Sequence, residues 1–328
     1  MSETAIQADV NAIYTLQVGN QFGTDRYALF FEPGTYGTQS SPLDIPVGYY
    51  TEVDGLGQDP SDVVINGGVT AVGMNGSGAL DIFWRSVSNL TIHVVPVAPG
   101  DCHASNEMWA VSQAAPMRRV DVKDFTTFMP YCENPNFASG GFVADSDLEG
   151  GALNGSQQQF YVRNSNLGTG GWSNYVWNQV FSGDINAPAQ DFGAGAAYTT
   201  LAQTPVSREK PYLYIDGSGK WNVFVPSPQT NSVGTTWANG HTPGTSIPLS
   251  KFFIATPSDS VSKINNALSR GLNLLLTPGV YNVNSPIKVK RTDAVVQGLG
   301  FATLTATSGS TALTTADVAG IDISGLIV

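Results

Sequence analysis

The stretch at residues 27–38, YALFFEPGTYGT, decides the fold, because the chain repeats it at residues 272–283 as LNLLLTPGVYNV. In each copy an apolar run leads into the sequence Pro-Gly-x-Tyr, and Gly-x-Gly follows some twenty residues later. The second motif stands at residues 55–57 and again at 298–300. A unit repeated in the same order at this separation predicts two domains of the same kind in tandem.

Each copy is preceded by a segment with apolar residues at helical spacing. The first segment, residues 3–16, is expected to cap the open end of a core, as a solenoid requires for solubility. The second segment, residues 257–271, has Ser258 or Asp259 as its predicted N-cap and Gly271 as its predicted stop. The repeat unit is therefore a helix, a strand, a Pro-Gly turn, a second strand and a glycine turn.

Short β-like runs separated by turn residues fill the chain between the two copies. Several of them share a local pattern with one apolar anchor, and the anchors are Leu90, Val120, Leu148 and Leu167. Their spacing suits one structural coil per repeat, and no amphipathic helices lie between them. We predict an all-β protein built as a right-handed parallel β-helix, in tandem, with short capping helices. A β-sandwich is the competing architecture, and it would favour more Asn-Gly hairpin signals than the chain has.

The predicted organisation has three parts. Residues 1–184 form a first β-helix domain, and residues 185–257 form a Pro-rich connector with a hairpin at the Asp-Gly-Ser-Gly turn 216–219. Residues 258–328 begin a second β-helix that stops mid-strand, so we expect this chain to be the front portion of a longer protein. In the connector, Glu209 stands between two basic residues, which favours an ion pair with them or with another domain.

Composition restricts the class of partner. The net charge is −11 and only 12% of the residues are charged, which argues against nucleic acid because phosphate binding needs clustered Lys and Arg. No stretch is long and apolar enough to span a membrane. The three histidines are isolated, so neither a metal nor a cofactor is expected. A neutral polysaccharide suits this chain best, with the protein acting as a monomer.

Cys102 and Cys132 are the two cysteines, and both lie in loop-like sequence. If successive coils stack, the two loops would lie one above the other within disulfide reach. The disulfide depends on export to an oxidising compartment. Export is inferred from the class of protein, because the polar N-terminal stretch does not resemble a leader peptide.

The stretch GGFVADSDLEG at residues 140–150 carries three carboxylates. Strict strand alternation would point Phe142 inward and place Asp145, Asp147 and Glu149 in a row on the outer face. Paired carboxylates supply the acid and base of glycoside hydrolysis, and clustered oxygens can hold Ca²⁺. A solvated acidic face and a turn is the plainer interpretation.

Three adjacent glutamines, residues 157–159, precede the strand FYVR. Phe160 and the valine two residues later fit the inner face, so Gln159, Tyr161 and Arg163 would face outward together. An amide on a rigid coil can orient a water or hold a sugar hydroxyl. The alternative is an amide ladder between neighbouring coils.

Aromatic residues are plentiful, with six Trp and 12 Tyr. Their faces can stack on pyranose rings, although most are expected to pack in the core or between domains. We expect two of the tryptophans, Trp172 and Trp177, to contact ligand.

These features resemble glycoside hydrolase family 55, the β-1,3-glucanases of the pectin-lyase-like superfamily. The resemblance rests on the tandem Pro-Gly-x-Tyr units and on the stretch GSQQQFYVRNSNLG at residues 155–168. The chain is also similar to secreted actinobacterial and fungal proteins with pectin-lyase-like repeats. The family implies an inverting exo-hydrolase that works between its two domains, with Gln159 and its neighbour Gln158 holding the attacking water. Its general acid is a Glu of the second domain for which this chain offers no match.

Three functions follow from the sequence. The first is a hydrolase of a neutral β-glucan, a β-1,3-glucan by resemblance. The second is a polysaccharide lyase or galacturonan-type hydrolase that uses Asp145, Asp147 and Glu149 as its catalytic carboxylates. The third is a non-catalytic solenoid for glycan binding or adhesion. Fold alone does not decide among them, because many chemistries share this architecture.

Overall fold

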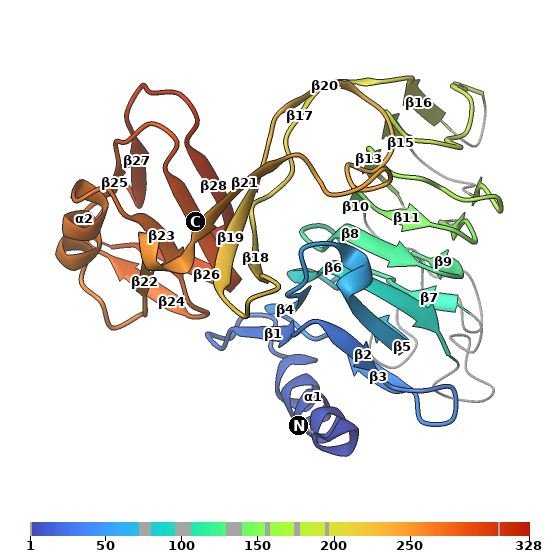
Figure 1. Cartoon of the computed structure of the whole chain (residues 1–328), viewed down its shortest axis with the longest axis horizontal. Helices are drawn as coiled ribbons and strands as arrows, with labels where there is room; N and C mark the ends of the chain where they lie inside the picture. The colour runs from blue at the N-terminus through green and yellow to red at the C-terminus, as the bar shows by residue number, and fades with distance from the viewer. Residues whose placement is uncertain are drawn as a thin grey trace.

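The computed structural model describes residues 2–71, 80–95, 106–128, 140–154, 158–173, 178–193, 197–307 and 309–328. Figure 1 shows two stacks of strands joined by a connector that spans the space between them. We call residues 27–201 the first stack, residues 204–248 the connector and residues 252–328 the second stack. Strands dominate and most of their pairings are parallel, which confirms the prediction of an all-β protein.

The first stack is built from one long parallel sheet and a smaller one beside it. Each coil adds one strand, so the strands pair in chain order and their inner residues stack into one continuous core. The long sheet runs in the order β1 (Tyr27–Phe31), β4 (Thr51–Gly55), β6 (Arg85–Val94), β8 (Pro116–Val122), β10 (Gly141–Ala144), β13 (Phe160–Arg163), β15 (Asn178–Ser182) and β16 (Ala197–Leu201).

The remaining strands of the first stack form the second face of the coils. The smaller sheet holds β7 (Asn106–Met108), β9 (Phe125–Thr127), β12 (Ala152–Leu153) and β14 (Trp172–Ser173). The lowest coils add β2 (Gly34–Tyr36), β3 (Leu43–Pro46), η1 (Pro60–Asp62) and β5 (Val63–Thr70), and β11 (Asp147–Leu148) pairs with β8.

Helix α1 (Glu3–Gln17) lies beneath the lowest coil (Figure 1). Ser2 is its N-cap and accepts a hydrogen bond from the backbone N–H of Ala5. Val10 is buried in the first core, with Ile6 packed against it. The helix therefore covers the open end of the apolar core, as predicted.

A column of left-handed residues forms one corner of the first stack. Asn89, Arg119, Asp145 and Asn164 have φ between 50° and 55°, and strand pairing places them one above another. A left-handed residue interrupts the alternation of side chains between the two faces of a strand. Odd and even positions therefore exchange faces at this corner. The predicted apolar anchors align with one another only in part. Leu90 pairs with the anchor Val120, whereas Leu148 pairs with Val122 instead.

The connector is antiparallel. Strand β17 (Thr204–Ser207) pairs with β20 (Gln229–Ser232), and β18 (Tyr212–Ile215), β19 (Trp221–Pro226) and β21 (Gly244–Pro248) form a three-stranded sheet. The hairpin predicted between β18 and β19 is confirmed. Asp216 closes its turn by accepting hydrogen bonds from the backbone N–H groups of Ser218 and Lys220.

The second stack has its own core, separate from the first. Its strands are β22 (Phe252–Ala255), β23 (Asn273–Leu276), β24 (Val280–Val283), β25 (Ile287–Val289), β26 (Val295–Ala306), β27 (Leu313–Thr315) and β28 (Asp322–Ile327), with η3 (Leu249–Lys251) at its start. Helix α2 (Val261–Ser269) begins after Ser260, whose side chain caps Lys263 N–H, so the predicted N-caps at Ser258 and Asp259 are wrong. Asp259 instead accepts a hydrogen bond from the Thr256 N–H.

The two repeated motifs fold alike. Tyr36 Oη donates to the carbonyl of Glu32, and Tyr281 Oη donates to the carbonyl of Thr277, so each tyrosine bonds back across its Pro-Gly turn at the same distance in sequence. In both Gly-x-Gly turns the first glycine lies against the backbone of the neighbouring coil. A Cβ added at Gly55 would lie 2.0 Å from the Asn89 carbonyl oxygen. Close approach of the neighbouring coil therefore requires a glycine there.

Candidate functional site

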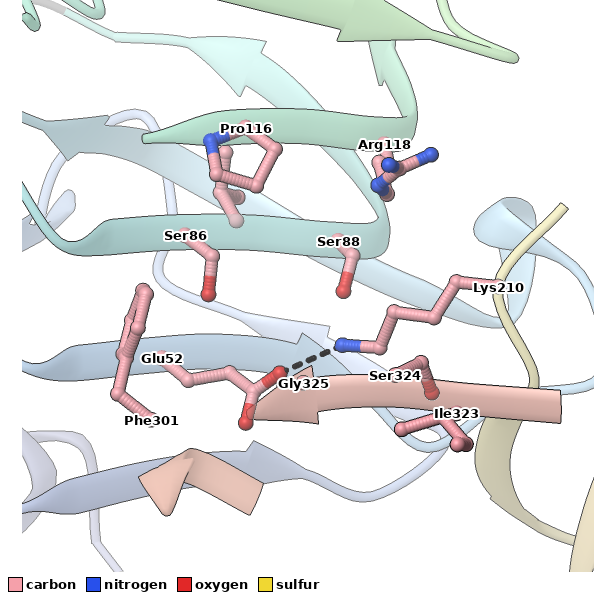
Figure 2. Close-up of a pocket in the computed structure, with 11 residues that line it drawn as sticks. Glu52, Ser86, Ser88, Pro116, Arg118, Lys210, Phe301, Ile323, Ser324 and Gly325 are labelled. Carbon is pink, nitrogen blue, oxygen red and sulfur yellow. Dashed lines mark hydrogen bonds and ion pairs between the residues drawn. The ribbon is translucent and has the colours of Figure 1, made fainter. Parts of the chain in front are cut away.

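The two stacks face each other across a cleft that contains two adjoining cavities, with volumes of about 270 and 360 Å³. Figure 2 shows strand β28 of the second stack opposite β4 and β6 of the first, with Lys210 entering from the connector. We call this region the inter-stack cleft. The residues that line it are Glu52, Ser86, Val87, Ser88, Pro116, Arg118, Phe142, Tyr161, Arg163, Val206, Arg208, Glu209, Lys210, Pro211, Phe301, Asp322, Ile323, Ser324 and Gly325.

Three consecutive connector residues hold the cleft together. The side chain of Glu209 is only 3% exposed. Its carboxylate pairs with the guanidinium group of Arg118 at 3.4 Å and also with that of Arg163. Arg208 pairs with Asp322 of β28 at 2.9 Å. Glu209 therefore pairs with the first stack rather than with its neighbours in sequence. Because these charges are buried, removing one partner would leave the other unpaired and would lower the stability of the protein.

Glu52 ties all three parts of the chain at one point. Its Oε1 accepts a hydrogen bond from Lys210 Nζ at 2.8 Å, and its Oε2 accepts one from the backbone N–H of Gly300 in the second stack at 2.5 Å. Burial, reinforced by the nearby Glu52 carboxylate, raises the pKa of the neighbouring Asp54 to about 8. Ser88 donates its hydroxyl hydrogen to Asp54.

The wall formed by β8, β10 and β13 combines aromatic and cationic groups. The Phe142 ring lies 5.4 Å from the Tyr161 ring, and the Arg118 guanidinium lies 4.5 Å above Phe142. Tyr161 is 37% exposed. Tyr161 and Arg163 thus face outward into the cleft as predicted, and Phe160 points into the core. This wall can stack a pyranose ring and donate hydrogen bonds to its hydroxyls.

Two hydroxyls in the cleft have unused hydrogen-bonding capacity. The Oγ atoms of Ser86 and Ser324 are buried and have no hydrogen-bond partner among the described residues. Figure 2 shows the Ser86 hydroxyl pointing into the cavity. Buried polar atoms without partners are rare in folded proteins, so these hydroxyls suit a hydroxyl-bearing ligand.

The predicted glutamines lie beside this wall. Gln159 is exposed and Gln158 is half-buried, immediately before β13. Gln159 therefore has the accessibility that a water-positioning residue needs, and that role remains a prediction. Its backbone carbonyl accepts a hydrogen bond from the Gly141 N–H, which fixes the position of its coil.

The predicted outward row of three carboxylates is wrong. Val143 lies in the core, and Phe142 faces outward instead. Asp145 is fully buried at the left-handed corner, where its Oδ2 pairs with Arg119 at 3.1 Å. It also accepts hydrogen bonds from the Thr236 N–H and hydroxyl, and its backbone carbonyl accepts one from Trp237 Nε1. Asp145 thus attaches the connector to the first stack.

The other two carboxylates of this stretch lie away from the cleft cavities. Asp147 accepts hydrogen bonds from the side-chain amide of Asn166, on the next coil. Glu149 is 45% exposed at its side chain and pairs with Lys123 at 2.6 Å. Burial raises the pKa of Asp147 above its ordinary value, and the hydrogen bonds from Asn166 oppose this rise. Neither residue lines the cavities.

Trp172 is partly buried and packs against the first core. Its ring lies 5.3 to 5.6 Å from those of Phe128, Phe160 and Phe181. The substrate-binding role of Trp172 stays a prediction, and its packing against these three rings does not favour it. Trp177, Cys102 and Cys132 lie outside the described residues.

Sequence reasoning missed the residues that reach the cleft from distant parts of the chain, namely Glu52, Arg118, Lys210 and Phe301. One signal was available, because the basic pair at 118–119 falls within a predicted strand of a chain with few charges. Among the described residues, no group of three His, Cys, Asp or Glu side chains gathers as metal ligands. No helix in the described ranges is long and apolar enough to cross a membrane.

Comparison with known proteins extends this picture. The family model of the LAM55 pectate lyase-like domain matches residues 252–328. An exo-β-1,3-glucanase of Streptomyces sp. (strain SirexAA-E / ActE) is 46% identical over 324 residues, which are 98% of this chain and 51% of that protein. The chain thus spans about half the length of the curated relative it matches.

Solved structures of sacteLam55A from Streptomyces sp. SirexAA-E are similar at 46% identity. One superposes with a TM-score of 0.90 and covers 98% of this chain and 55% of that one. A variant of sacteLam55A in complex with glucose superposes at 0.89 with the same coverage. These matches confirm the resemblance to glycoside hydrolase family 55 that the sequence shows.

Proposed function

We propose that this chain forms part of an inverting glycoside hydrolase that releases glucose from β-1,3-glucan in the inter-stack cleft. The observation that carries the proposal is the cleft wall, where the exposed Tyr161 and the half-buried Arg163 line the cleft and the exposed Gln159 directly precedes their strand. The relative of 46% identity is an exo-β-1,3-glucanase, and the variant of sacteLam55A that this chain resembles was solved in complex with glucose. A polymeric substrate suits an extracellular protein that works as a monomer.

In this proposal, two β-helix domains stand in tandem. Strand pairing supports boundaries near residues 201 and 252, because β16 pairs with the first stack and β22 with the second. These limits modify the predicted ranges 1–184, 185–257 and 258–328. The cleft between the domains receives the glucan end, and the connector sets the width of the cleft.

Gln159, assisted by Gln158, orients the attacking water. Inverting hydrolysis also needs a carboxylic acid to protonate the leaving oxygen. Among the described residues of the cleft, the carboxylates are Glu52, Glu209 and Asp322, and each is paired with a cation. We propose that residues 1–328 alone lack the general acid.

The lyase or galacturonan-type alternative is not favoured. Asp145 is buried, and Asp147 and Glu149 already bond to Asn166 and Lys123 outside the cavities. The relative is a glucanase rather than a lyase or a binding protein, which also weighs against a solenoid that only binds glycans.

The test is laminarin hydrolysis, with glucose release followed by chromatography. Two proteins are compared: residues 1–328, and a chimera that continues this chain with the remaining half of the Streptomyces relative. We expect glucose from the chimera only, and the α-anomer first by proton NMR, because inversion changes the β-linkage. Gln159→Ala should abolish release, while Gln39→Ala, an exposed glutamine in the turn between β2 and β3, should not.

Three results would contradict the proposal. If the chimera folds but releases no glucose from laminarin, the glucanase function is wrong. If the β-anomer appears first, the inverting chemistry is wrong. If residues 1–328 alone hydrolyse laminarin at a comparable rate, the general acid lies within them.

A further inference from the structure

The smaller of the two cleft cavities, about 270 Å³ in volume, lies at the lower end of a column of side chains on the first stack. Strand register aligns five residues in successive coils, namely Glu52, Ser86, Pro116, Phe142 and Tyr161. The first three line the smaller cavity and lie one above another in Figure 2, whereas the last two line the larger cavity. We call the smaller cavity the basal cavity.

The basal cavity contains hydrogen-bonding groups that the protein itself leaves unused. Ser86 Oγ of the first stack and Ser324 Oγ of the second are buried without a partner among the described residues. Lys210 Nζ enters from the connector and donates to Glu52, and an ammonium group has three donors. Because buried polar atoms without partners are rare, the cavity suits a ligand with several hydroxyls.

The charged groups around the basal cavity are already paired with one another. Glu52 pairs with Lys210 at 2.8 Å, and Arg118 pairs with Glu209 at 3.4 Å. An ionic ligand would lose its hydration on entering and would find no unpaired counter-charge among the described residues that line the cavity. A neutral ligand avoids this cost, so the cavity favours a neutral sugar.

The second stack supplies an aromatic side chain to the basal cavity. Phe301 lines it beside Ile323 of β28. The φ of Phe301 is 60°, a conformation that is uncommon for a bulky residue and persists where the surrounding structure holds it. Here the preceding Gly300 N–H donates to Glu52, and the Thr303 hydroxyl donates to the Phe301 carbonyl. These bonds fix the backbone that presents the ring to the cavity, where it can contact the apolar face of a sugar.

Size and position limit the ligand to one free sugar. The volume lies just below the range of about 300–1,000 Å³ typical of small-molecule sites, so the cavity suits one pyranose. Tyr161 stands three coils above Ser86, about 14 Å away at about 4.8 Å per coil. Gln159, the predicted water-positioning residue, lies two residues before Tyr161. A glucan whose end lay in the basal cavity would therefore be cleaved several units from that end and would not release glucose.

We propose that the basal cavity binds the released glucose, as a product site separate from the reacting subsite beside Gln159. The inference rests on the proposed function, which supplies glucose as the product. Lys210 and Ser324 line both cavities, which gives the released sugar a path from one to the other. Glucose in the basal cavity would contact the first stack through Ser86, the connector through Lys210 and the second stack through Ser324. Bound product would thus stabilise the folded arrangement of the two stacks.

The test is a glucose titration of residues 1–328, read by saturation-transfer NMR and by thermal unfolding. Glucose should bind and raise the unfolding temperature, and laminaribiose should bind no more tightly than glucose. Ser86→Ala and Ser324→Ala should each weaken glucose binding about tenfold, the scale of one lost hydrogen bond. Neither should lower the unfolding temperature without glucose, because each hydroxyl lacks a partner among the described residues. The matched control is Ser61→Ala, an exposed serine of η1, which should bind glucose like the wild type.

The product site would be overturned by a wild-type chain that does not bind glucose, or by serine variants of the cavity that bind it normally. Tighter binding of laminaribiose than of glucose would also overturn it, because the cavity would then hold glucan rather than product. The proposed function has its own readout, which is glucose release by the chimera. If the chimera releases glucose but residues 1–328 do not bind it, the glucanase stands and only the product site is removed. If the chimera releases no glucose, the proposed function is wrong and the product role falls with it.

Discussion

Replacing Asp145 by Asn should destabilise the protein. Its carboxylate is 0% exposed at the side chain, and the paired Arg119 is only 4% exposed. One oxygen receives Arg119 and the Thr236 hydroxyl, and the other receives the Thr236 N–H. An amide removes the charge and turns an NH₂ group toward one of these donors. Arg119 is then left buried without its counter-charge.

The expected loss is about 3–5 kcal/mol of unfolding free energy, the range for removing one partner of a buried ion pair. Urea unfolding followed by tryptophan fluorescence measures it, provided that the transition is two-state. Glu149→Gln is the matched control from the same stretch, because its ion pair with Lys123 lies at the surface and should contribute about 1 kcal/mol or less.

A double-mutant cycle identifies the cause. Arg119→Met combined with Asp145→Asn should be less destabilised than the sum of the two single variants, because the double variant leaves no unpaired charge. If Asp145→Asn lies within 1 kcal/mol of the wild type, as Glu149→Gln should, the inferred role of Asp145 in attaching the connector is wrong.

Three further predictions concern charge, the site and the core. The pKa of Asp54 is raised to about 8, well above about 3.9 in an unfolded chain, so the folded state retains a proton between these values and its stability falls as pH rises from about 4 to 8. Asp54→Asn should flatten this dependence in thermal unfolding, and an unchanged slope would refute the raised pKa. Gln159→Ala should leave the urea midpoint of residues 1–328 unchanged because the side chain is exposed, and a large shift would show that Gln159 is structural. Phe181→Ala should cost about 3–5 kcal/mol, since the ring is fully buried, and a loss below 1 kcal/mol would show that the upper coils are loosely packed.

Much of the fold was predictable because its signals are local. The Pro-Gly-x-Tyr unit predicts a turn wherever it occurs, and in both copies the tyrosine bonds back to the same carbonyl position. The Asp-Gly-Ser-Gly turn predicts its hairpin for the same reason. Strand alternation placed Phe160 inward and Tyr161 outward correctly, because β13 is a regular strand up to its end.

The same alternation failed one coil below. Gly141–Ala144 is short, and the chain turns at Asp145 with φ of 52°. Asn and Asp favour this conformation, and they supply three of the four corner residues, but Arg119 adopts it as well, so residue type alone does not locate the corner. Val143 and Leu148 both lie in the core although they are five residues apart, so the alternation shifts phase at Asp145 and no single strand pattern fits the whole stretch.

The sequence by itself determined the repeat, the stacked coils, the connector hairpin and the family, because these depend on turn chemistry and apolar spacing within short stretches. Only the tertiary structure decided the cleft. Glu209 meets Arg118 and Arg163, and Glu52 meets Lys210 and Gly300, across 46 to 248 residues of chain. Which charges meet depends on coil register and on how the connector crosses between the stacks, and local sequence patterns do not encode either of these.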